Sequence, residues 1–155
     1  MEILLSQYML YVIIAIFLAV AAVFDLHDGT IPLPLFPTLF ALFVPLAVMS
    51  ENFNPVSSFI GLLIAFFCFF ILARFFDGGG GDILMMSVLG WCLGARNLVC
   101  LIFAAGGFYL VFSLFVALIY LLRKRPVREA LKAQYPYAPF VLAGYAVCFV
   151  SGWLV

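Results

Sequence analysis

The chain has 155 residues, of which 68% are hydrophobic and 9% are charged, and its mean hydropathy is +1.31. A soluble globular domain normally has an apolar fraction of about one half, so this composition excludes such a domain and indicates a membrane protein. Seven basic and seven acidic side chains give a formal net charge of zero. The chain therefore lacks the excess of basic residues that would favour a nucleic acid as a partner.

Long apolar runs, separated by short polar or Gly/Pro clusters, fill the sequence from end to end. A helical crossing needs about 20 apolar residues, and these runs are continuously apolar, whereas barrel strands alternate. We therefore predict an all-α, polytopic integral membrane protein with one transmembrane domain over residues 1–155. Its six predicted transmembrane helices, the fourth of them short, are Ile3 to Phe24, Ile31 to Met49, Val56 to Phe76, Ile83 to Gly94, Leu98 to Leu122 and Tyr137 to Val155.

Five of the seven Lys and Arg side chains lie between the fifth and sixth predicted spans. Because cytoplasmic loops carry an excess of Lys and Arg, we expect this segment to be cytoplasmic, together with the loops Asp25 to Thr30 and Arg74 to Asp82. Both termini and the loop Ser50 to Pro55 are expected outside, in a lipid-embedded, multi-pass protein of the inner (cytoplasmic) membrane. A hairpin at the fourth segment is an alternative that would reverse the later spans.

The fourth run, Ile83 to Gly94, is too short to cross a bilayer alone. At 1.5 Å per residue it reaches only about 18 Å, against a hydrocarbon core of about 30 Å. Either the bilayer thins and Arg96 extends outward to the interface, or the helix begins below the cytoplasmic surface with Gly78 to Asp82 recessed in a cavity. Gly90 and Gly94 form a GxxxG pattern, which is typical of close helix packing.

Four of the seven acidic residues lie in two predicted cytoplasmic loops: Asp25, Asp28, Asp77 and Asp82. Asp25 and Asp82 each adjoin an apolar helix, and an ionisable group at the boundary of a span is a candidate functional group. Asp28 and Asp77 are interpreted as solvated loop acids. Asp82 follows the run Gly78 to Gly81, and glycines permit positive φ angles and close approach of the backbone.

His27 is the only histidine of the chain. Asp25, His27 and Asp28 could in principle supply metal ligands, or a general base with a group that orients it. No second cluster of ligands accompanies them, so we expect neither a metal nor another cofactor. The four cysteines lie within apolar runs and lack the spacing of a metal site, which predicts a packing role for them.

Three segments resemble the type IV prepilin peptidases, which are polytopic aspartyl proteases sharing a GxGD motif. Asp25 to Pro32, DLHDGTIP, is similar to the family's Asp followed by five variable residues and Ile-Pro. Gly79 to Asp82, GGGD, fits the GxGD motif ahead of the fourth helix. Pro136 to Phe140, PYAPF, is similar to the entry to the family's last helix. The resemblance covers nearly the whole chain.

Carried over by position, the resemblance implies that Asp25 and Asp82 are the catalytic pair of an aspartic-type endopeptidase. It implies removal of the short basic leader from prepilin-like or Flp-type pilin precursors at the cytoplasmic side of the membrane, in type IV pilus biogenesis, with the pilus assembly machinery as a candidate partner. The residues implied to shape the loops and hold substrate are Gly79, Gly80, Gly81, Ile31 and Pro32.

This chain resembles the small, peptidase-only branch of the family, because it lacks the cysteine-bearing methyltransferase segment of the longer members. Leu84 stands where many members carry Lys, and Leu33 where they carry Asn or Asp. Neither difference removes a carboxylate, but both concern how substrate is held. One alternative function is therefore that of a non-catalytic homologue. Another is a small ion-coupled membrane transport subunit that uses the same acids, although the sequence shows no inverted repeat typical of transporters.

The helix ends predict different roles for the two aspartates. Asp82 precedes a predicted helix, whose positive dipole end favours an anion, whereas Asp25 follows one, whose negative end disfavours it. We therefore predict Asp82 as the resting base and Asp25 as the carrier of a proton shared by the pair.

Overall fold

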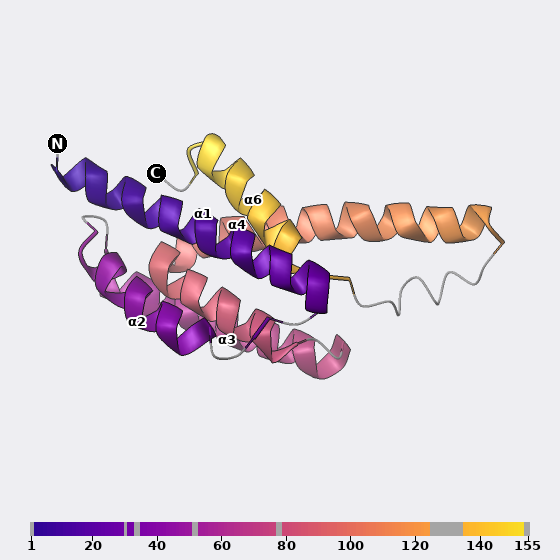
Figure 1. The fold of residues 1–155 in the computed structure, drawn as a ribbon, viewed down its shortest axis with the longest axis horizontal. Coiled ribbons are helices and arrows are strands. Elements are labelled where there is room, and N and C mark those ends of the chain that lie inside the picture. Colours follow the sequence, from indigo (N-terminus) through magenta and orange to yellow (C-terminus); the bar gives the residue numbers. More distant parts are fainter. Residues whose placement is uncertain are drawn as a thin grey trace.

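The computed structural model describes residues 2–29, 31–32, 35–50, 53–76, 79–124 and 135–153. Regular structure in these ranges is helical throughout, which confirms the predicted all-α class (Figure 1). The helices are α1 (Glu2–Asp28), α2 (Leu35–Val48), α3 (Pro55–Phe76), α4 (Gly80–Leu122) and α6 (Ala138–Val150). By length and composition, α1, α3 and α4 can each cross a membrane.

The prediction of six spans is not supported: the described residues form five helices, three of them of spanning length. The second and sixth predicted spans became helices of only 14 and 13 residues, α2 and α6. α6 is short because both of its ends are set locally. Pro139 lies in its first turn, and Gly152, at φ 74°, closes it in a left-handed conformation that glycine readily adopts.

The fourth and fifth predicted spans form one element, α4, which is broken at Gly94. Gly94 has φ 75° and ψ 170° and divides α4 into a first half, residues 80–93, and a second half, residues 95–122. Ser57 of α3 stabilises this break, because its Oγ accepts a 3.1 Å hydrogen bond from the Ala95 N–H at the start of the second half. Ser57 thus serves as an N-cap from a neighbouring helix.

The chain folds back at this break. Asp82, near the start of α4, interacts electrostatically with Tyr137, and the ring of Tyr109 in the second half lies 5.8 Å from the same tyrosine. An unbroken helix would separate residues 82 and 109 by about 40 Å. The reversal at Gly94 therefore brings the beginning of α4 and the middle of its second half to one place.

α3 and the first half of α4 approach each other through glycines. A Cβ added at Gly90 would lie 2.5 Å from the carbonyl oxygen of Gly61, and one added at Gly61 would lie 2.9 Å from the carbonyl carbon of Gly94. Only residues without a Cβ allow the two backbones to come this close. The close packing predicted from the GxxxG pattern is therefore confirmed.

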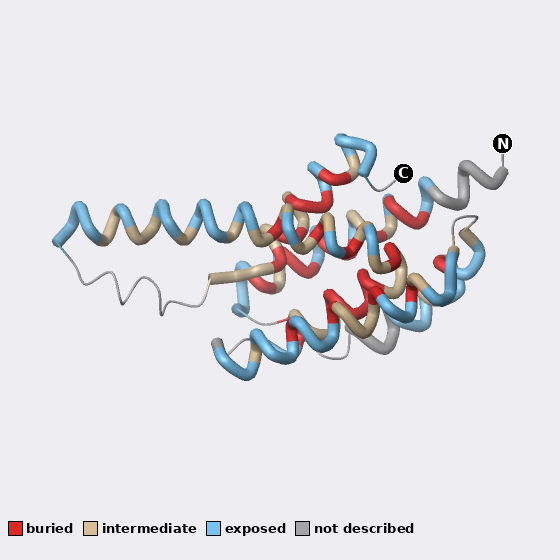
Figure 2. Tube along the Cα trace, turned by 180° about the vertical axis from the view of Figure 1, so that it is seen from behind, coloured by how far each residue is buried: buried red, intermediate tan, exposed pale blue. Residues whose placement is uncertain are grey.

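Buried residues gather in the middle of the molecule (Figure 2). α6 is joined to α1 by the Tyr145 hydroxyl, which donates a 2.9 Å hydrogen bond to the Tyr11 carbonyl. It packs on the second half of α4 at Gly144, where an added Cβ would lie 2.7 Å from the backbone nitrogen of Ala105. The largest fully buried side chains are Phe43, Ile14, Leu18, Met85, Met86, Leu89, Leu98, Leu101, Val141 and Cys148.

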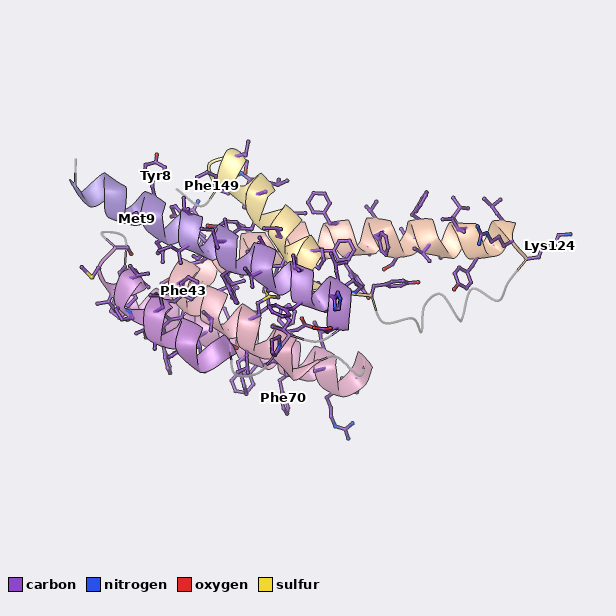
Figure 3. All side chains as sticks on the ribbon, viewed as in Figure 1. Tyr8, Met9, Phe43, Phe70, Lys124 and Phe149 are labelled. Carbon is purple, nitrogen blue, oxygen red and sulfur yellow. The ribbon has the colours of Figure 1, made fainter. Side chains whose placement is uncertain are left out.

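The second half of α4 extends beyond the ends of α1 and α3, and its far part is exposed or half-buried (Figures 1 and 2). The exposed side chains there are large and apolar: Leu110, Val111, Phe112, Leu114, Phe115, Leu118, Leu121 and Leu122. Such a surface suits lipid rather than water. Lys124 stands at the tip of this extension (Figure 3).

Candidate active site

Asp25 lies in the last turn of α1 and is 7% exposed. Gly29 ends the helix at φ 65°, and its N–H donates a 3.1 Å hydrogen bond to the Asp25 carbonyl. The carboxylate is held from elsewhere in the chain: its Oδ2 accepts a buried 2.8 Å hydrogen bond from the backbone N–H of Ala138, the first residue of α6. A group at the end of one helix is thereby fixed by the beginning of another.

The Ala138 N–H is available because of how α6 begins. The first N–H groups of a helix have no partner within the helix. The next residue, Pro139, has no N–H, and the amides of Phe140 and Val141 both donate to the carbonyl of the N-cap residue. That residue supplies no side-chain cap. Asp25 therefore caps α6 in addition to any chemical role.

Asp82 is the third residue of α4 and is half-buried. Its N–H donates a 3.2 Å hydrogen bond to the carbonyl of Gly79, which closes the first turn. Asp82 therefore lies at a helix N-terminus, as predicted.

Of the predicted loop-shaping residues, Gly81 and Ile31 meet at the site. A Cβ at Gly81 would lie 3.0 Å from the Ile31 Cβ, so the start of α4 packs against the segment that follows α1 here. A Cβ at Gly80 would meet open space, and one at Gly79 would lie 3.9 Å from Oδ2 of Asp82. Among the described glycines of the run, Gly79 to Gly81, only Gly81 is closely packed. Pro32 is half-buried.

The structure brings Asp25 and Asp82 together, since the charge of Asp25 acts on Asp82. Two carboxylates that share a site do not both ionise readily, so such a pair tends to hold one proton between them. Tyr137 stands beside them: it interacts electrostatically with Asp82 and is followed directly by Ala138, which binds Asp25. Two carboxyl groups and a phenolic hydroxyl therefore lie near one another at this end of the molecule.

Aromatic rings surround Tyr137. Its ring centroid lies 5.6 Å from that of Phe69 on α3 and 5.8 Å from that of Tyr109 on α4. Phe140 continues the cluster with ring distances of 5.4 Å to Tyr109 and 5.2 Å to Phe112. Sequence analysis singled out the segment Pro136 to Phe140 but no site residue within it; the tyrosine inside that motif was the available signal.

His27 and Asp28, the other candidate ligands considered from the sequence, lie at the surface. His27 Nδ1 and Asp28 Oδ1 are 2.7 Å apart, with side chains 84% and 52% exposed, so they form a surface pair with each other. Leu84 is half-buried. Asp77 and Leu33 lie outside the described residues.

The model of the type IV leader peptidase family matches residues 12–122 of the chain. The chain belongs to this family. The segment that matches the type IV leader peptidase model contains both aspartates and ends with α4. α6, whose Ala138 N–H binds Asp25, lies beyond it. Comparisons with curated proteins and with solved structures find no match.

The helix-end argument for the roles of the aspartates was incomplete. Asp25 lies in the last turn of α1 rather than after it, but it also lies at the N-terminus of α6 and accepts an N–H from it. The positive end of α6 opposes the negative end of α1 at this carboxylate. The position of Asp25 on its own helix therefore does not decide which aspartate is the base.

Proposed function

We propose that the protein is a membrane-embedded aspartyl endopeptidase that removes the short basic leader from prepilin-like precursors at the cytoplasmic side of the inner membrane. The observation that supports this most is the meeting of Asp25 and Asp82 beside Tyr137, in a chain of the type IV leader peptidase family. The two acids come from the end of α1 and the start of α4, so their proximity is a property of the fold rather than of a local motif.

Peptide hydrolysis by two carboxyl groups requires one of them ionised and one protonated. The carboxylate takes a proton from water while the resulting hydroxide adds to the scissile carbonyl carbon, and the protonated carboxyl gives its proton to the carbonyl oxygen. When the carbon–nitrogen bond breaks, the carboxyl formed in the first step gives its proton to the leaving amine. The other carboxylate takes a proton from a hydroxyl of the diol as the carbonyl forms again, which restores the starting pair. A pair that shares one proton meets this requirement without any further group.

We assign the base to Asp25 and the shared proton to Asp82, which reverses the roles predicted from the sequence. The Ala138 N–H donates to Oδ2 of Asp25, and such a bond is stronger to a carboxylate than to a neutral acid. The N-terminus of α6 adds its positive dipole end at the same atom. Asp82 lacks a donor of this kind among the described residues, apart from its own helix N-terminus.

The proposed orientation places this site toward the cytoplasm in a multi-pass protein with both termini outside. Arg123 and Lys124 follow the end of α4 that extends past the site, and basic residues favour the cytoplasmic side. A leader rich in Lys and Arg would approach from that side.

Co-expression with a Flp-type prepilin that carries a basic leader tests the proposal, with leader removal measured by mass spectrometry. We expect processing by the wild type and none by Asp25→Asn or Asp82→Asn, because each change removes one of the two proton-transfer groups. Asp28→Asn is the matched control, since this exposed acid lies three residues from Asp25 and pairs with His27. Leader removal that continues in both aspartate variants would end the proposal.

A further inference from the structure

Asp25 depends on a backbone amide, and a backbone amide must itself be held in position by side chains. We propose that Tyr137 is a positioning residue for Asp25: its ring, packed between Phe69 of α3 and Tyr109 of α4, keeps the Ala138 N–H on Oδ2 of the carboxylate. The inference rests on the proposed peptidase function, in which Asp25 takes a proton from water.

Tyr137 is linked to Asp25 through one peptide unit, whose N–H at Ala138 donates the hydrogen bond to the carboxylate. The Tyr137 carbonyl and the Ala138 N–H belong to one planar group, so neither can rotate without the other. The carbonyl accepts hydrogen bonds of 3.0 Å and 3.2 Å from Phe140 and Val141, and the N–H donates to Asp25 at 2.8 Å. Whatever fixes the Tyr137 side chain therefore also fixes the donor that reaches Asp25.

The ring of Tyr137 is fixed from two helices. It meets Phe69 at an interplanar angle of 53° and Tyr109 at 64°, both within the range of favourable tilted or edge contacts. α3 and α4 are themselves joined by close glycine contacts. The clamp, by which we mean the Tyr137 ring with Phe69 and Tyr109, therefore contacts α3 and the second half of α4, and α4 also carries Asp82 at its start.

The consequence for the reaction concerns the two oxygens of Asp25. With Oδ2 occupied by the Ala138 N–H, Oδ1 is the oxygen left to face water and the shared proton. Among the described residues this is the one hydrogen bond that the carboxylate accepts. Loss of the ring clamp would free the carboxylate to rotate, which lowers the rate of proton abstraction without removing a substrate contact.

The test measures kcat and KM of the full-length protein in proteoliposomes, with a synthetic prepilin leader peptide as substrate. Tyr137→Ala is expected to lower kcat about 10- to 100-fold, the size of effect produced by a small misplacement of a reacting group, with KM nearly unchanged. Tyr137→Phe keeps the ring and should restore most of kcat. Tyr8→Ala, an exposed tyrosine at the far end of α1, is the matched control (Figure 3).

Two outcomes would overturn the positioning role. If Tyr137→Phe loses as much activity as Tyr137→Ala, the hydroxyl acts rather than the ring. If Tyr137→Ala raises KM and leaves kcat intact, the side chain contacts substrate instead of holding the amide. Wild-type enzyme that cleaves no prepilin, or cleavage that survives Asp25→Asn and Asp82→Asn, counts against the proposed function.

A second measurement does not depend on activity. Thermal unfolding of Asp25→Ala, Tyr137→Ala and the double variant forms a double-mutant cycle. If Tyr137 holds the amide on Asp25, the second substitution costs less once the first has been made, so the falls in melting temperature do not add. Additive falls would contradict the clamp, even in a protein that proves inactive or in a variant that folds poorly.

Discussion

The two ends of the first half of α4 use glycine for opposite purposes. At the end near Gly94, a Cβ at Gly90 would lie 2.5 Å from the Gly61 carbonyl oxygen, and glycine there permits backbone contact. At the Asp82 end, Gly79 and Gly80 are exposed, and a Cβ at Gly80 would meet nothing within 4 Å. Glycines that look alike in the sequence therefore serve packing at one end and open space beside a carboxylate at the other.

Gly81 stands between these two cases. It follows the exposed Gly79 and Gly80 in the sequence, yet it is buried against Ile31. It thereby joins the start of α4, which carries Asp82, to the segment that follows α1. The site end is thus held by a few contacts of definite geometry: this glycine, the Ala138 amide and the ring of Tyr137. The Gly94 end is held by continuous helix contact.

Gly61→Val should have the largest effect, because it disrupts the close contact between α3 and the Gly94 end of the first half of α4. The new side chain would meet the backbone of Gly90 and Gly94, which cannot rotate away as a side chain can. Overpacking typically costs about 1 to 3 kcal/mol, and a clash with backbone lies at the upper end of that range. Thermal unfolding and monodispersity in detergent measure the loss. Gly106→Val is the control, since a Cβ there meets nothing within 4 Å; equal behaviour of the two variants would contradict the close contact.

Gly81→Val should act on the site end, with activity falling more than stability. Its Cβ would lie 3.0 Å from that of Ile31, so the loop must shift and Asp82 with it. We expect kcat for leader removal to fall about tenfold, a loss typical of a misplaced catalytic group. Gly80→Val should lose less, because that position is open. The reverse order would show that the exposed glycines, rather than Gly81, shape the site.

Two substitutions of Asp25 separate its proposed catalytic role from its capping of α6. Asp25→Asn and Asp25→Ala should both abolish leader removal, but Asn keeps an oxygen that can accept the Ala138 N–H. Loss of a helix cap costs about 1 kcal/mol, so Asp25→Ala should unfold at a lower temperature than Asp25→Asn. Identical melting temperatures for the two variants would contradict the capping of α6 by Asp25.

Ser57→Ala should have the smallest effect, at the Gly94 end. It removes the Oγ that accepts the Ala95 N–H and leaves the start of the second half of α4 without this cap. We expect a loss of about 0.5 to 1 kcal/mol in thermal unfolding and unchanged leader removal. Asn54 offers a second cap for comparison, because its side chain accepts two hydrogen bonds at the start of α3 and lies far from the aspartates in sequence. A large loss of activity in Ser57→Ala would show that the ends are coupled.

Part of the fold was predictable for a simple physical reason. Continuous apolar runs bounded by polar residues predicted α1 and α3 to within a few residues, and glycine marked the break within α4. α2 and α6 were predicted too long because hydropathy continues past their ends. Pro139 and Gly152 set the bounds of α6 through backbone geometry, which an apolar count does not register.

The sequence by itself determined that this is a helical membrane protein and which two acids adjoin its helices, because burial in lipid demands long apolar runs and leaves few charges to consider. Only the tertiary structure decided how Asp25 is held. Its partner is a backbone amide 113 residues away, and every residue except proline carries such an amide. Which amide reaches the carboxylate depends on the reversal at Gly94 and on the rings around Tyr137, which exist only once the helices have packed.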